Sequence, residues 1–92
     1  MAVPEDELRH RVAHMRQERE HVDFMEKTAA LIGKRLARGV APEQRQGMAA
    51  SLEALVRANR GLREAAGSAP EPGELAAEAA LDTLAAGLRK PY

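Results

Sequence analysis

Cysteine, aromatic side chains and strand-favouring residues are absent or scarce in this sequence of 92 residues. The lack of cysteine excludes both a disulfide framework and a thiolate metal site. Phe24 and Tyr92 are the two aromatic residues, so a core has to be filled by aliphatic side chains and alanine, which suits close-packed helices. β-Branched residues are also few. We therefore expect an all-α fold without strands.

An excess of positive charge is absent as well. Lysine and arginine number 14, aspartate and glutamate number 14, and the formal net charge is zero. A nucleic-acid-binding domain normally carries a basic excess or stripe, so we expect no nucleic-acid partner. Six basic residues could still form a local patch, which we interpret as a solvated face: Lys34, Arg35, Arg38, Arg57, Arg60 and Arg63.

Long hydrophobic runs are missing too. The most apolar stretch, around Ala29 to Ile32, is far shorter than the roughly 20 residues that cross a bilayer. The first ten residues, MAVPEDELRH, are acidic and polar, unlike a secretory signal peptide. We expect a cytoplasmic protein with no membrane partner.

Glycine and proline divide the chain into three expected helices within a single domain, residues 1–92. The first spans residues 4–38, starting at Pro4 and ending before Gly39. A turn at 39–42 leads into a second helix, 42–66, which Pro42 opens and Gly67 ends. A linker at 67–73 precedes a shorter helix at 74–88, and a short tail follows.

Apolar residues recur in steps of three and four along the first two helices, which predicts one apolar seam on each. The short turn should place the helices side by side, so we expect a long antiparallel hairpin with a short third C-terminal helix. Asn59 is a polar residue within the second seam and could fix the register. The seam residues are Leu8, Val12, Met15, Arg19, Val22, Met25, Ala29, Ile32 and Leu36 in the first helix, and Met48, Leu52, Leu55, Asn59, Leu62 and Ala66 in the second.

The first helix carries a second apolar face. Phe24, Thr28 and Leu31 lie roughly 120° around a regular helix from the seam. Two interpretations remain open: the third helix covers this face, or a partner protein docks on it. The predicted partner-binding residues are Phe24, Thr28 and Leu31, with Met25 and Ile32 beside them. Charged substitutions at Phe24 and Leu31 should then abolish partner capture and leave helicity intact.

Side chains capable of catalysis or metal binding form no convincing cluster. His10, His14 and His21 would share a stripe of a regular helix with Gln17, but no fourth ligand is evident, so we expect no metal site. We interpret the acidic runs as charged side chains on exposed helix faces. Because no strands are expected, the sequence has no phosphate-binding loop of the strand-loop-helix kind. We assign no catalytic residue, no cofactor and no enzymatic activity.

The middle of the chain resembles the small YscE/PscE-like proteins of type III secretion systems. The resemblance covers about residues 21–66, and its most specific part is RLARGVAPEQRQ, residues 35 to 46. It implies a helical hairpin that acts as a co-chaperone beside a larger helical-repeat chaperone, the pair keeping the needle subunit soluble and unpolymerised in the cytoplasm before export. The alternative is a self-associating helical-bundle protein, such as a homodimer, with a regulatory or structural role.

Overall fold

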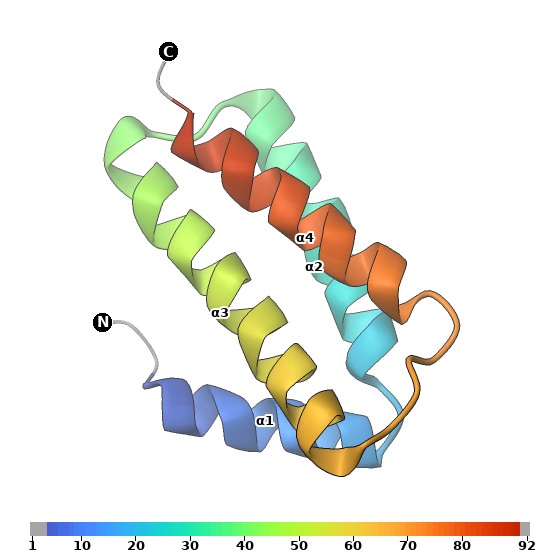
Figure 1. The fold of residues 1–92 in the computed structure, drawn as a ribbon. Helices are drawn as coiled ribbons and strands as arrows, with labels where there is room; N and C mark the ends of the chain where they lie inside the picture. The colour runs from blue at the N-terminus through green and yellow to red at the C-terminus, as the bar shows by residue number, and fades with distance from the viewer. Residues whose placement is uncertain (1–3, 91–92) are drawn as a thin grey trace.

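The computed structural model describes residues 4–90, and it contains four α-helices in that range (Figure 1). They are α1 (Glu5–Gln17), α2 (His21–Arg38), α3 (Pro42–Ala66) and α4 (Glu74–Arg89). No strand occurs within residues 4–90, so the predicted all-α class is confirmed. The two last residues of the expected tail, 91–92, lie outside the described range, as do residues 1–3.

The expected single helix over residues 4–38 is wrong, because the chain turns at residues 18–20. Arg19 adopts the left-handed conformation with φ of 59°. The Glu20 N–H donates to the Met15 carbonyl at 2.8 Å and the Arg19 N–H to the Arg16 carbonyl at 3.1 Å. This is the Schellman ending of a helix, in which glycine usually occupies the left-handed position. Because an arginine stands there, the sequence carries no glycine signal for the break.

The bounds of α3 agree with the prediction, and α4 extends one residue beyond its predicted end at residue 88. Helix α3 spans Pro42–Ala66 and has proline in its first turn. Gly67 ends it in the left-handed conformation, with the Ser68 N–H donating to the Arg63 carbonyl at 3.1 Å. This ending has the same hydrogen-bond pattern as that of α1, now built on the expected glycine.

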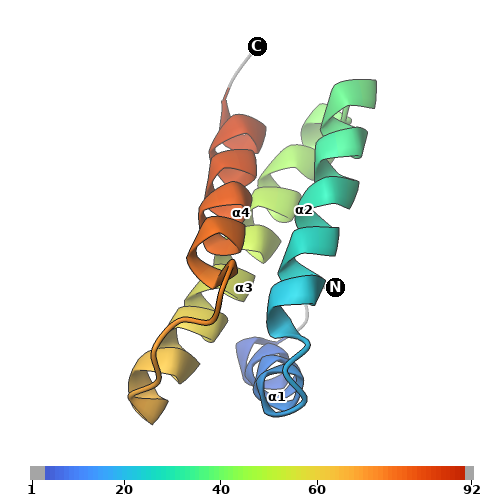
Figure 2. The same ribbon diagram turned by 90° about the vertical axis from the view of Figure 1, so that its right-hand side faces the viewer.

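Helices α2 and α3 do not pack against each other along their apolar seams, contrary to the prediction. They diverge, and α4 packs against both of them, whereas direct contact between α2 and α3 is slight (Figures 1 and 2). Helix α1 crosses the far end of the molecule and packs mainly on α3 (Figure 2). The hairpin with an appended third helix is therefore replaced by a four-helix arrangement in which α4 completes the core.

The core consists of aliphatic side chains and alanine from all four helices and from the α2–α3 turn, as the shortage of aromatic residues requires. Several expected seam residues, such as Val12, Met25 and Leu52, belong to it, while Arg19 and Ala66 are exposed. Its buried members are Val12, Met25, Val40, Ala49, Leu52, Leu55, Val56, Ala58, Ala77, Leu81, Ala85 and Leu88.

A candidate helix-binding groove and a buried charge network

The divergence of α2 and α3 leaves an open groove between them that α4 does not fill. It has a volume of about 640 Å³ and a predominantly apolar surface. Phe24, Thr28 and Ile32 of α2 form one wall, and residues of α3 form the other, with Leu8 of α1 at one end. The α3 residues are Glu43, Gln44, Gly47, Met48, Ser51, Leu52 and Leu55.

Each of α2 and α3 turns one face to α4 and another to the groove. On α2, Met25 lies in the core, while Thr28, three residues later, lines the groove. On α3, Arg63 and Asn59 bond to α4, while Met48 and Ser51 line the groove. At about 100° per residue, Met25 and Thr28 lie about 60° apart around α2, and Arg63 and Met48 lie about 60° apart around α3. The groove is therefore a second helix-sized space beside the one that α4 occupies.

The structure separates the five predicted partner-binding residues into three groups. Phe24, Thr28 and Ile32 line the groove, and the Phe24 side chain is 42% exposed. Leu31 is 60% exposed but does not line the groove. Met25 is 1% exposed and packed in the core, as its place in the predicted seam requires, so its assignment as a partner-binding residue is wrong. Helix α4 leaves Phe24 and Leu31 uncovered, so of the two interpretations left open above, coverage by the last helix does not hold.

Two charged residues of opposite sign stand at the end of the groove nearest the α2–α3 turn. Arg35 lies on the α2 wall and Glu43 on the α3 wall. Both are exposed, and within residues 4–90 neither takes part in an ion pair. The groove is thus apolar along its length, with a positive and a negative group at one end.

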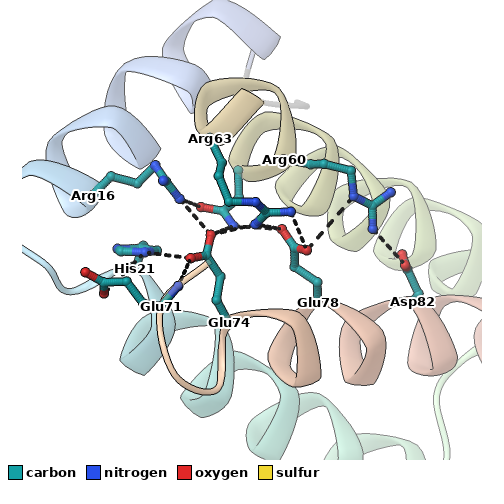
Figure 3. A network of polar contacts seen from close by, with 9 residues as sticks. Arg16, His21, Arg60, Arg63, Glu71, Glu74, Glu78 and Asp82 are labelled. Carbon is teal, nitrogen blue, oxygen red and sulfur yellow. Dashed lines mark hydrogen bonds and ion pairs between the residues drawn. The ribbon is translucent and has the colours of Figure 1, made fainter. Parts of the chain in front are cut away.

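A buried charge network on the α4 side was not predicted (Figure 3). The Glu74 and Glu78 side chains of α4 are fully buried and point toward Arg63 of α3. Arg63 Nη1 donates to Glu74 Oε2 at 2.6 Å and to Glu78 Oε2 at 2.9 Å, and Asn59 Nδ2 donates to the same two oxygens at 2.9 and 2.8 Å. From α1, Arg16 Nη1 donates to Glu74 Oε2 at 2.7 Å. Two guanidinium groups thus neutralise two carboxylates.

These contacts shift the pKa values of two members of the network, Glu74 and Arg63. Burial alone would raise the pKa of Glu74, but hydrogen bonds from the Glu71 backbone N–H, Arg63, Arg16 and Asn59 hold that pKa well below its ordinary value. The hydrogen bond to Glu78 likewise raises the pKa of the Arg63 guanidinium, against the effect of burial. Both carboxylates are enclosed and paired, so they cannot reach a substrate. The network instead fastens α4 to α1 and α3.

The far end of α4 is fastened by other arginines. Arg45 of α3 donates from Nε to the Leu88 carbonyl at 3.0 Å and from Nη2 to the Gly87 carbonyl at 2.8 Å. These carbonyls belong to the last turn of α4, where a cation is favourable. Arg89 donates to both carboxylate oxygens of Glu53, at 2.8 and 2.6 Å. Polar contacts at both ends therefore set the register of α4 on α3.

The predicted histidine stripe does not form, because the turn at residues 18–20 divides it. His10 and His14 are exposed on α1, whereas His21 is 3% exposed at the start of α2. His21 Nε2 lies 3.5 Å from Glu74 Oε1 and 3.7 Å from Glu71 Oε2, and neither ring nitrogen has a hydrogen-bond partner in the structure. Within residues 4–90 no group of three or more acidic or histidine side chains is arranged to hold a metal ion.

The six basic residues that could have formed one patch are dispersed. Arg63 is buried in the charge network. Arg57 pairs with Glu5 at 2.5 Å, and Arg60 lies 3.6 Å from Asp82. These three are on the C-terminal half of α3, whereas Lys34, Arg35 and Arg38 are at the C-terminal end of α2, beside the N-terminus of α3. A continuous basic surface of all six is not present.

None of the helices in the described range is both long and apolar enough to cross a membrane. Comparisons with protein-family models, with curated proteins and with solved structures gave no match.

Proposed function

We propose that this protein is a non-enzymatic adaptor that binds an amphipathic helix of a partner protein in the groove between α2 and α3. The observation that carries the proposal is the divergence of these helices around an open apolar groove with Phe24 on its wall. Apolar grooves between helices bind partner helices through anchor residues spaced by three, four and seven positions. Such a surface on a small domain is a common mark of an interaction site.

The dimensions of the groove favour a helix as the occupant. From Phe24 to Arg35 the α2 wall covers roughly 17 Å, or about three helical turns. Helix α4 already fills the neighbouring space between the same two helices, so a further helix would extend the same packing. An acidic residue near Arg35, or a basic one near Glu43, would add charge complementarity at the turn end.

The resemblance to YscE/PscE-like proteins specifies the partner class. In this form of the proposal, the protein is a cytoplasmic co-chaperone of a type III secretion system. It binds a helical-repeat chaperone, and together they keep a needle subunit soluble. The turn that carries the resemblance, at residues 39–41, joins the two helices that form the groove.

Co-expression with the products of neighbouring genes, followed by affinity purification and size-exclusion chromatography, tests the proposal. A complex with a helical-repeat protein and a small needle-like subunit is the expected result. Phe24→Asp should remove the partner from the complex. Leu75→Asp is the matched control, because Leu75 is 56% exposed and lies on α4, outside the groove. If both variants retain the partner equally, the groove is not the binding site.

A further inference from the structure

The two charged residues at the turn end of the groove point to a specific occupant in the absence of a partner. Arg35 stands on the α2 wall and Glu43 on the α3 wall, at the same end. Neither has an ion-pair partner within residues 4–90. A surface that offers a positive group on one side and a negative group on the other can be complementary to itself.

We infer that a second copy of this chain closes the groove, forming a parallel two-fold dimer held by reciprocal Arg35–Glu43 pairs. When two grooves face each other across a two-fold axis parallel to α2 and α3, α2 of each copy lies opposite α3 of the other. The two turn ends then coincide, so Arg35 of each copy meets Glu43 of the other. The apolar walls, with Phe24 and Met48, form the centre of the interface.

Charges elsewhere on the chain permit this arrangement. The formal net charge is zero, so two copies do not repel each other through their overall charge. On α1, whose Leu8 lines the other end of the groove, Glu5 pairs with Arg57 and Glu7 with Arg11 within each copy. The dimer goes beyond the function proposed above, because it closes the groove without a partner and must open for a partner helix to enter.

Sedimentation equilibrium of the purified chain over a concentration series tests the inference. A species of twice the 10.0 kDa chain mass should accumulate with concentration. Arg35→Glu and Glu43→Arg should each raise the dissociation constant at least about tenfold, because each places like charges opposite one another in both pairs. Lys34→Glu makes the same charge change beside the groove and should have little effect.

Mixing the two single variants gives the decisive result. Each variant alone places like charges opposite each other, whereas a heterodimer of Arg35→Glu with Glu43→Arg restores two opposite-charge pairs. Equimolar mixing should therefore recover the wild-type dissociation constant to within about threefold. A chain that stays monomeric up to about 1 mM, or a dimer that ignores these substitutions, overturns the inference. The assay contains this chain alone, so its outcome is independent of partner capture.

Discussion

Arg63 Nη1 donates a hydrogen bond to Glu74 Oε2 at 2.6 Å, and both side chains are buried between α3 and α4. The contact joins two helices separated by the glycine- and proline-containing linker at residues 67–73. The same Glu74 oxygen accepts from Arg16 of α1 at 2.7 Å. One carboxylate thus ties together three of the four helices, and the alignment of α4 depends on it.

Removal of one member of this network should be costly. Glu74→Gln is expected to lower the free energy of unfolding by about 3 kcal/mol, because it leaves the buried Arg63 charge with less compensation. Chemical denaturation measures the change. Arg57→Met is the control: it breaks the exposed Arg57–Glu5 pair and should cost less than about 1 kcal/mol. Equal effects of the two substitutions would mean that the buried network contributes no more than a surface pair.

The Arg63–Glu78 pair should be energetically coupled. Arg63→Met and Glu78→Gln each leave the other charge buried, whereas the double variant removes both, so the two costs should not add. We expect a coupling of about 1 to 3 kcal/mol in a double-mutant cycle. Additive costs would contradict the direct interaction that the hydrogen bonds at 2.9 and 3.2 Å imply.

Stability should decrease in acid because of Glu74. Its pKa in the folded protein lies well below the ordinary value of 4.5, so its contribution is present above pH 4.5 and is lost as the pH falls toward the folded-state value. Below pH 4.5 the unfolding free energy should therefore fall more steeply in the wild type than in Glu74→Gln, by about 1.4 kcal/mol per pH unit. Denaturant titrations at several pH values measure both slopes. Equal slopes for the wild type and Glu74→Gln below pH 4.5 would contradict a lowered pKa of Glu74 in the folded protein.

The turn between α1 and α2 should tolerate glycine. Arg19→Gly is expected to raise the unfolding free energy by roughly 0.5 to 1 kcal/mol, because glycine adopts the left-handed conformation without a Cβ penalty. Thermal unfolding measures the shift. Ala30→Gly, in the exposed interior of α2, should instead cost about 1 kcal/mol. Destabilisation by both would show that α1 and α2 are continuous in solution.

Phe24 and Met25 are neighbours in the sequence but should respond differently to truncation. Met25→Ala removes a fully buried side chain and should cost about 2 to 5 kcal/mol. Phe24→Ala affects a side chain that is 42% exposed and should cost about 1 kcal/mol. Urea unfolding of both variants checks the division between core and groove wall. A larger loss of unfolding free energy for Phe24→Ala than for Met25→Ala would contradict the placement of Met25 in the core and Phe24 on the groove wall.

The sequence was sufficient to predict the all-α class and the bounds of α3, because proline, glycine and apolar spacing act locally. Pro42 and Gly67 have the conformational roles that their residue types favour. The break at Arg19 could not be predicted from such local preferences, because the left-handed conformation is uncommon for arginine. Tertiary contacts next to the break help to hold it, among them the hydrogen bonds that Arg16 donates to Asn59 and Glu74.

The buried face of α4 could not be read from hydrophobicity. Its buried residues include Glu74 and Glu78 as well as Ala77, Leu81 and Leu88. A pattern of apolar residues leaves the glutamates on the surface, and they are buried only because Arg63 and Arg16 approach from other helices. Asn59 was the one available signal, as a polar residue in the expected seam.

Of the two walls of the groove, the sequence predicted most of the α2 wall. Phe24, Thr28 and Ile32 share a face of one helix, so periodicity brings them together. The α3 wall and Leu8 depend on the angle between helices, which periodicity does not specify. Met25 was predicted both as a seam residue and as a partner-binding residue beside Phe24, and the structure bears out the seam position alone, since its side chain lies in the core.

Site-specific photocrosslinking in cells that contain the partners tests most directly whether the groove binds another protein. A photoreactive residue in place of Ser51, which is exposed and lines the groove, should crosslink to a helical segment of a partner protein. The same residue in place of Ala80, exposed on α4, should not. Crosslinking to the partner from position 80 and none from position 51 would contradict the proposed function.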